Sequence, residues 1–391
     1  MASLYKRKLS FSLFVLLLAT QLCFGEIIKN EDFNFTLDIP EGYNLLDSSN
    51  DGLSNMYNHE NIPVEFISIV YEDEGYFSSK DTLESALLKL SATADIDSFT
   101  WSNKECALAY VDFYTDQEYT GWALSAPVAN NSYLVLICYS PINTESSCQK
   151  FIFSTLNSLS IDEYYYNTPG IITTYAFPKQ GKKNFTTTIN KQKITYSLDK
   201  SDIDAANFVI DMEYEILLYY ANHELVFDAW KRYYRMIYRD NYGRIQNFAE
   251  QVYKTLYPIA YDNKPKNPDI EYAQYLLSWV QSFPYGRNAG AGNSDFPSIP
   301  AILTGQNSDC DSRSMLLCIL LEYSGIDTLL LIAPEYSHAL AAADINAPGQ
   351  KIYNKDNDRD YIIGETTAPV TWGMLSQEQA DRTKWFYVIL P

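Results

Sequence analysis

The sequence predicts an α+β protein with an N-terminal α/β sandwich-like domain, a middle α+β segment, and a C-terminal domain in which a helix packs on an antiparallel sheet. Three observations support this prediction. Before residue 163, strand-like runs rich in β-branched and aromatic residues alternate with apolar runs of helical period. Stretches rich in Pro, Gly and charge then separate two amphipathic helices from their neighbours. In the last third, one helix is followed by successive strand-like runs, which is the order of a helix-on-sheet domain.

Residues 1–25 are predicted to be a signal peptide. Lys6, Arg7 and Lys8 precede the apolar run SFSLFVLLLATQLCF, which is shorter than a membrane-spanning helix needs. Cleavage after Gly25 suits the small-residue rule, and an uncleaved anchor is the weaker alternative. We therefore expect an exported chain, in the periplasm, at the cell surface or secreted, with no transmembrane helix in its mature part.

The charge balance restricts the partners that the protein can have. The chain has 29 basic and 49 acidic residues, a formal net charge of −20. Such a surface repels phosphate backbones and anionic lipids, so nucleic acid and anionic membranes are poor partners. The length of 391 residues is sufficient for two or three domains, each with its own core.

Residues 26–163 are predicted to form the N-terminal α/β domain, with a binding or packing role. The strand-like runs are VEFISIVY, CALAYVDFY and SYLVLICYS, and the helical runs are DTLESALLKL and SSCQKFIFSTLNSL. His59 lies in the polar stretch NMYNHENIP, and we expect it to be a solvated loop residue. Cys138 and Cys148 flank a turn, where either a local disulfide or a pair of buried free thiols is expected.

Residues 164–268 are predicted to contain a connector, strands and amphipathic helices. The run ITYSL alternates as a strand does, and two helices follow it. Gly243 is expected to end the first of these helices, and the stretch from Pro258 to Pro268 is expected to be a second connector. His223 lies near the start of the first helix, where we expect a structural role.

Residues 269–391 form the predicted catalytic domain. The helical run EYAQYLLSWVQSF precedes a polar, Gly- and Pro-rich loop over 286–300, which we interpret either as a lid over a cleft or as a surface connector. A helix is predicted from Cys310 to Tyr323, followed by the strand-like runs TLLLIAP, HALAAADI and YIIGETT.

Cys310 is the candidate nucleophile because it begins an apolar helix and the residues next to it are polar. Ser308 or Asp309 can cap this helix, and the free backbone N–H groups of its first turn favour a thiolate. The neighbouring Asp309 and Asp311 oppose the thiolate unless they point away. Cys318, eight residues later among leucines, is expected to be core. Five cysteines follow the predicted signal, so at least one thiol is expected to be unpaired.

His338 and Glu365 complete a candidate catalytic triad. Each opens or closes one of the strand-like runs that follow Cys310, and neighbouring antiparallel strands bring cross-strand side chains to about 5 Å. His338 would take the thiol proton, and Glu365 would hold the other imidazole nitrogen. The Cys310 N–H is the expected oxyanion donor, with Gln306 as candidate for the second. Without CxxC or HExxH spacing we expect no metal, and this chemistry needs no cofactor.

The text of this region resembles the transglutaminase-like superfamily over about residues 271–367. The matching stretches are SWVQSFPY, DCDSRSMLLCILLEYSGI, HALAAAD and YIIGETTAP. The resemblance implies a papain-like fold and a Cys, His, Asp/Glu triad in this chain order, with Cys310, His338 and Glu365 at the matching positions. The chain departs from the family at Ser308, where Gly is common, at Ser312, where Asp is common, and at Glu365, where Asp followed by Pro is commonest.

These patterns lead to two hypotheses of function. The first is an exported cysteine peptidase or amidase that acts on a protein, peptide or other amide through a thioester at Cys310. Hydrolysis is expected over transamidation, because water is always present and nothing in the sequence marks an amine site. The alternative is a catalytically inactive transglutaminase-like scaffold that binds proteins or glycans at the cell surface.

Overall fold

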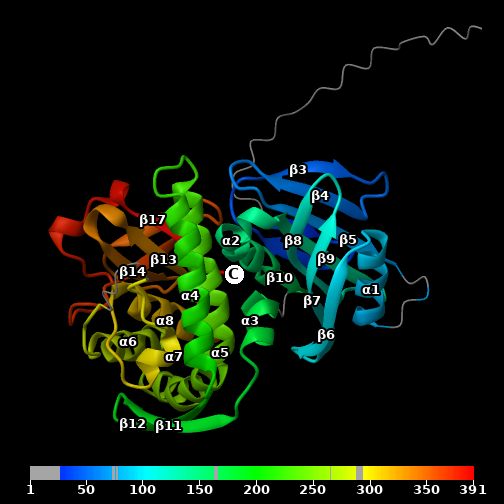
Figure 1. The fold of residues 1–391 in the computed structure, drawn as a ribbon. Helices are drawn as coiled ribbons and strands as arrows, with labels where there is room; N and C mark the ends of the chain where they lie inside the picture. Colours follow the sequence, from blue (N-terminus) through cyan, green and yellow to red (C-terminus); the bar gives the residue numbers. More distant parts are fainter. Residues whose placement is uncertain (1–26, 73–74, 76–77, 163–165, 265, 288–293) are drawn as a thin grey trace, which may run out of the picture.

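The computed structural model describes residues 27–391 except 73–74, 76–77, 163–165, 265 and 288–293. The signal peptide predicted for residues 1–25 lies outside the described residues. The protein is α+β, as the sequence predicts. In Figure 1 two long helices, α4 (Asp202–Tyr219) and α5 (Val226–Asn263), stand between an N-terminal sheet and a C-terminal part drawn in yellow to red. Within the described part of the chain, no helix combines the length and the apolar character that crossing a bilayer requires.

The N-terminal part is an antiparallel sheet with one helix on each face. Its strand order is β3-β4-β5-β9-β8-β7-β6. Along β9, Leu134 and Leu136 face α2, whereas Val135 and Ile137 face α1, because successive side chains of a strand point to opposite faces. A small sheet of β1, β2 and β10 lies beside it. The bounds are β1 Ile27–Asn30, β2 Phe35–Asp38, β3 Tyr43–Ser48, β4 Ser54–His59, β5 Glu65–Tyr71, α1 Ser79–Lys89, β6 Thr93–Trp101, β7 Lys104–Tyr114, β8 Glu118–Pro127, β9 Tyr133–Pro141, α2 Glu145–Asn157 and β10 Leu159–Ile161.

The prediction that His59 is a solvated loop residue is wrong. His59 ends β4 and is only 5% exposed, with its ring in edge contact with Tyr43 and Phe151. Its Nδ1 accepts a hydrogen bond from the Ile62 N–H, and its Nε2 lies 3.2 Å from the Tyr220 hydroxyl. Burial lowers the pKa of His59 to about 4, so the ring is neutral at physiological pH.

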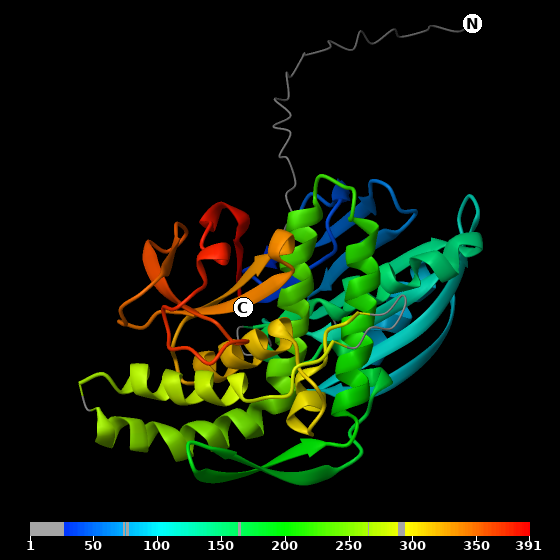
Figure 2. The same ribbon diagram turned by 90° about the vertical axis from the view of Figure 1, so that its left-hand side faces the viewer.

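The middle segment differs from its prediction at α5, which is one continuous helix through Gly243 and Pro258. A Cβ at Gly243 would lie 2.3 Å from Pro169 Cδ, so this glycine allows the chain to pack closely instead of ending a helix. Pro258 removes one backbone hydrogen bond, but α5 has an apolar face that packs along its length. Before α4 come α3 (Ile171–Ala176) and the hairpin of β11 (Lys182–Ile189) and β12 (Gln192–Asp199), at the foot of the molecule in Figure 2.

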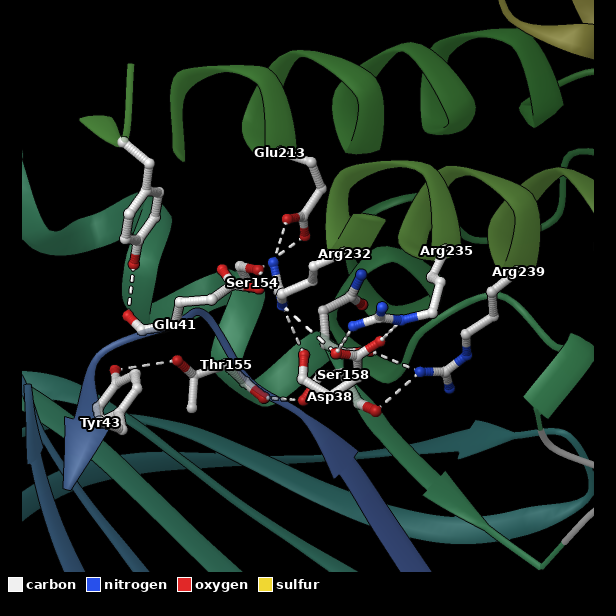
Figure 3. A network of polar contacts seen from close by, with 12 residues as sticks. Asp38, Glu41, Tyr43, Ser154, Thr155, Ser158, Glu213, Arg232, Arg235 and Arg239 are labelled. Atoms are coloured by element: carbon white, nitrogen blue, oxygen red, sulfur yellow. Dashed lines mark hydrogen bonds and ion pairs between the residues drawn. The ribbon is translucent and has the colours of Figure 1, made fainter. Parts of the chain in front are cut away.

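A row of arginines on α5 joins the helix to the N-terminal part (Figure 3). Arg235 forms two hydrogen bonds with the Asp38 carboxylate, at 2.7 and 2.8 Å. Arg232 donates to Glu213 at 2.6 Å and to the Asp38 carbonyl at 2.7 Å. Arg239 donates to backbone carbonyls at the end of α2, including that of Ser158 at 2.9 Å. The helix is therefore joined to β2 of the small sheet and to the end of α2 by buried and partly buried, charge-assisted hydrogen bonds.

The C-terminal part places one helix on an antiparallel sheet of order β15-β16-β14-β13-β17. Ala339, Ala341 and Ala343 of β14 face α8, and the alternate residues face a second apolar cluster that includes Trp385. The predicted helix and the three predicted strands are present, and β15 and β17 complete the sheet. The bounds are α6 Pro268–Gln281, α7 Ile299–Leu303, α8 Cys310–Tyr323, β13 Thr328–Ala333, β14 His338–Ala343, β15 Lys351–Asn354, β16 Arg359–Gly364 and β17 Phe386–Ile389.

The cysteines of the described residues are free and buried, Cys138 and Cys148 among them. Of the two alternatives for this pair, the structure therefore has the buried thiols. Cys318 is fully buried in α8 and its Sγ lies 3.7 Å from the Leu329 carbonyl oxygen, in agreement with the predicted role in the core.

Candidate active site

Cys310 is the first residue of α8, and a capping box fixes this end of the helix. The Asp309 carboxylate accepts the Ser312 N–H at 2.8 Å, and the Ser312 hydroxyl accepts the Asp309 N–H at 3.0 Å. This reciprocal arrangement satisfies two of the N–H groups that a helix start leaves unpaired. Asp309, one of the two predicted caps, is therefore the one that the structure uses.

The turn before Cys310 is held against the end of α6. Ser308 N–H donates to the Pro284 carbonyl at 3.0 Å, and Gly286 N–H donates to the Ser308 carbonyl at 3.0 Å. A Cβ at Gly286 would lie 2.6 Å from Asn307 Nδ2, so a larger residue here would require the Asn307 side chain to move.

Arg313 is a buried positioning residue that ties three segments of the site together. Its guanidinium donates to the Ser308 hydroxyl at 2.8 Å, to the Phe283 carbonyl at 2.6 Å and to the Thr366 carbonyl at 3.2 Å. The adjacent Ser314 hydroxyl lies 3.3 Å from the Ala339 carbonyl oxygen. Arg313 and Ser314 thus link α8 to β14 and to the segment that follows β16.

His338 and Glu365 form a hydrogen-bonded pair. His338 opens β14, Glu365 follows the last residue of β16, and His338 Nε2 lies 2.9 Å from Glu365 Oε2. The other carboxylate oxygen accepts both the N–H and the hydroxyl of Thr367, each at 2.6 Å. Burial raises the pKa of Glu365, but the hydrogen bonds and the charge of His338 outweigh it and hold this pKa below its ordinary value of 4.5. Because an ionised carboxylate only accepts, Nε2 carries a hydrogen, which leaves Nδ1 as the nitrogen that can take a proton.

The Cys310 sulfur lies beside β14 but donates its proton to a different partner. Sγ lies 3.3 Å from Asp311 Oδ2, and the other oxygen of Asp311 accepts the Tyr234 hydroxyl at 2.5 Å. Burial and the charges of Asp311 and Asp309 raise the pKa of Cys310 to about 12, while the Ala339 N–H opposes this rise. No hydrogen bond joins Sγ to His338 in the structure, although both residues are described. At rest the site therefore holds a neutral thiol, and Asp311 does not point away from it.

Arg287 is a member of the site that sequence reasoning did not identify. Its Nη2 lies 3.9 Å from Cys310 Sγ and donates to the Ser337 carbonyl at 3.0 Å. The residue lies in the polar loop after α6, where one arginine among Gly and Asn gives no periodic signal. The stretch SWVQSFPY, which carries part of the family resemblance, ends two residues before Arg287.

The Gln306 side chain makes its contacts away from the three predicted catalytic residues. Its side chain is exposed and lines a pocket of about 330 Å³ between the β11–β12 hairpin and α7. Phe185, Trp279 and Phe283 are among the other lining residues, and none of the three predicted catalytic residues lines the pocket. Among the described residues, no hydrogen bond brings the Gln306 side chain toward Cys310.

The remaining predictions for this region concern metals and the loop over 286–300. The described residues contain no group of three or more His, Cys, Asp or Glu side chains placed to hold a metal ion. Residues 288–293 of the predicted lid or connector lie outside the described residues. The described end of this stretch enters α7.

Comparison with known proteins gives no family for this chain. No family model and no curated protein matches it. Among solved structures, the PsbP protein of Synechocystis has 7% identity and a TM-score of 0.30, over 35% of this chain and 91% of its own. A Bacteroides thetaiotaomicron protein has 13% identity and a TM-score of 0.25, over 57% and 79%. A candidate protease of Parabacteroides distasonis has 9% identity and a TM-score of 0.21, over 82% and 70%. These likenesses are too low to support any argument about function.

Proposed function

We propose that this chain is an exported, transglutaminase-like cysteine enzyme that hydrolyses amide bonds through a thioester at Cys310. The observation that carries the proposal is the His338–Glu365 hydrogen bond of 2.9 Å beside the N-terminus of α8. Thr367 fixes the second carboxylate oxygen, so the imidazole has one orientation and a defined tautomer. A merely solvated histidine and glutamate would not need this support.

The neutral thiol of the resting site makes His338 a general base during attack, without a preformed ion pair. Sγ turns from Asp311 and gives its proton to His338 Nδ1 as the S–C bond forms, and the carbonyl π electrons move to oxygen. Collapse breaks the C–N bond, and the amine leaves with the proton from the imidazolium. Water then attacks the thioester carbonyl while His338 takes its proton. Collapse breaks the C–S bond, releases the carboxylic acid, and returns the proton from the imidazolium to sulfur. Glu365 stabilises the imidazolium in both halves.

The test is a comparison of two cysteines of the same helix. The full chain, Cys310→Ala and Cys318→Ala are incubated with a peptide and amide library, and products are identified by mass spectrometry. We expect the same cleavage products from the full chain and Cys318→Ala, and none from Cys310→Ala. Products that persist in Cys310→Ala would overturn the proposal. Adding an alkylamine separates hydrolysis from transamidation, because only the latter attaches the amine to the acyl group.

A scaffold without activity is the second candidate. It is favoured by the hydrogen bond from Cys310 to Asp311 and by the raised pKa of this thiol. In that case Cys310 would react slowly with iodoacetamide, at a rate that His338→Ala leaves unchanged. The enzyme hypothesis requires a fall of about tenfold or more in the same comparison, since a general base contributes at least about 100-fold to turnover.

A further inference from the structure

We propose that Arg287 is a catalytic residue of this site, whose guanidinium pairs with the charged Cys310 sulfur and then donates a hydrogen bond to the oxyanion. The proposal rests on the proposed function. It assigns the second oxyanion donor to Arg287, where sequence reasoning suggested Gln306. The observation behind it is that Arg287 Nη2 contacts the sulfur itself, at 3.9 Å.

Two further contacts hold the Arg287 side chain beside the sulfur. Nη2 also donates to the carbonyl of Ser337, the residue before His338, at 3.0 Å, and Nη1 lies 3.8 Å from Asp295 Oδ2. The side chain is 41% exposed, whereas Cys310 is 1% exposed. The guanidinium is therefore accessible to solvent while it lies beside a buried sulfur.

Most of the other charged groups around the sulfur have partners, although Asp309 Oδ2 is buried without a hydrogen bond. Asp311 accepts from Tyr234 and from the thiol, and Asp309 caps α8. The ring of Tyr285 lies under Arg313, and its hydroxyl interacts with Arg287. His338 and Glu365 bond to each other, and Arg313 donates to Ser308, Phe283 and Thr366. Among the described residues, Arg287 is the cation that donates to sulfur.

The position also suits the reaction. When Sγ bonds to a carbonyl carbon, the carbonyl oxygen lies one bond beyond that carbon, within reach of donors that surround the sulfur. An oxyanion donor must come within about 2.7–3.1 Å of that oxygen, and a donor 3.9 Å from the sulfur needs only a small movement to do so. The Cys310 N–H at the helix start supplies the other hydrogen bond.

The experiment measures alkylation of Cys310 in the full chain by peptide mass spectrometry, with neutral iodoacetamide and anionic iodoacetate. The variants are Arg287→Gln, Arg287→Lys, His338→Ala and the control Arg359→Gln, which removes an exposed arginine that pairs with Asp344. We expect Arg287→Gln to slow iodoacetamide about tenfold, corresponding to a rise of about one unit in the thiol pKa. We also expect Arg287→Gln to lower the ratio of the iodoacetate rate to the iodoacetamide rate several-fold. Arg287→Lys should retain most of the iodoacetamide rate and of this ratio, and Arg359→Gln should change neither quantity.

The outcomes separate this inference from the proposed function. If His338→Ala slows alkylation but Arg287→Gln matches the full chain with both reagents, the role of Arg287 is refuted and the enzyme hypothesis stands. If Arg287→Gln acts as expected but His338→Ala has no effect, the cation pairs with the sulfur without an assembled triad. Circular dichroism of each variant shows whether it is folded. If Arg287→Gln is unfolded, Arg287→Lys still tests the role of the positive charge at this position.

Discussion

Replacing Asp311 by Asn should make Cys310 more reactive. The Asp311 carboxylate accepts the thiol proton at 3.3 Å and would repel the thiolate at the same distance. Asn has the same shape, its oxygen can accept the Tyr234 hydroxyl as Oδ1 does now, and its amide then points an N–H at the sulfur. The substitution therefore changes a repulsive neighbour into a donor without removing the link to α5.

The magnitude follows from the separation of the two charges. Unit charges 3.3 Å apart repel by about 1 kcal/mol at the dielectric constant of water and by about 5 kcal/mol at an effective value of about 20. Since one pKa unit corresponds to about 1.4 kcal/mol, the pKa of Cys310 should fall from about 12 by roughly one to four units. At a pH below both values, the thiolate fraction rises by about tenfold for each of those units.

The assay is the rate of carbamidomethylation of Cys310 at about pH 8, followed peptide by peptide. Asp116→Asn is the control, because it removes one negative charge from an exposed strand connection far from α8. We expect at least about tenfold faster alkylation in Asp311→Asn and no change in Asp116→Asn. Equal rates in Asp311→Asn and the unmodified chain would refute the view that this carboxylate keeps the thiol neutral.

Three further predictions concern stability. Because the pKa of Glu365 is lowered, its contribution to folding stability is present above its ordinary pKa of 4.5 and is lost as the pH falls through its folded-state pKa. The difference in unfolding free energy between the unmodified chain and Glu365→Gln should therefore shrink as the pH is lowered. Burial raises the pKa of Glu41 to about 7, and both carboxylate oxygens lack hydrogen-bond partners among the described residues. In urea titrations, Glu41→Gln should therefore be more stable than the unmodified chain above about pH 7 and equally stable near pH 4.5. Arg232→Met leaves the charge of buried Glu213 without a partner and should lower the free energy of unfolding by about 3–5 kcal/mol in denaturant titrations. Adding Glu213→Gln should recover part of this stability, and a double variant whose loss equals the sum of the two single losses would contradict the pairing.

The sequence predicted much of the C-terminal part because its signals are local. The helix starting at Cys310 has a capping residue and an apolar face, and the strands that follow are short apolar runs bounded by turn residues. The order of Cys310, His338 and Glu365 along these elements was sufficient to expect His338 and Glu365 together. Their hydrogen bond needs only neighbouring strands in a sheet.

The errors arose where tertiary packing overrides a local signal. Gly243 and Pro258 are helix-ending residues in isolation, but the packing of α5 on both sides keeps it intact. His59 stands in a polar stretch, yet the aromatic rings of Tyr43 and Phe151 bury it. β17 was not predicted, although its run FYVI is strand-like, and its pairing with the distant β13 is decided by the fold.

The sequence by itself determined the α+β class, the helix that presents Cys310, and the identity of the histidine and the acid that meet beside it. Periodicity, caps and strand signals are properties of neighbouring residues, so they can be read without the fold. The tertiary structure decided that Asp311 turns toward the sulfur and that Arg287 reaches it from the loop after α6. Side-chain direction and approach from a distant segment depend on how the whole chain packs, and no spacing in the sequence encodes them.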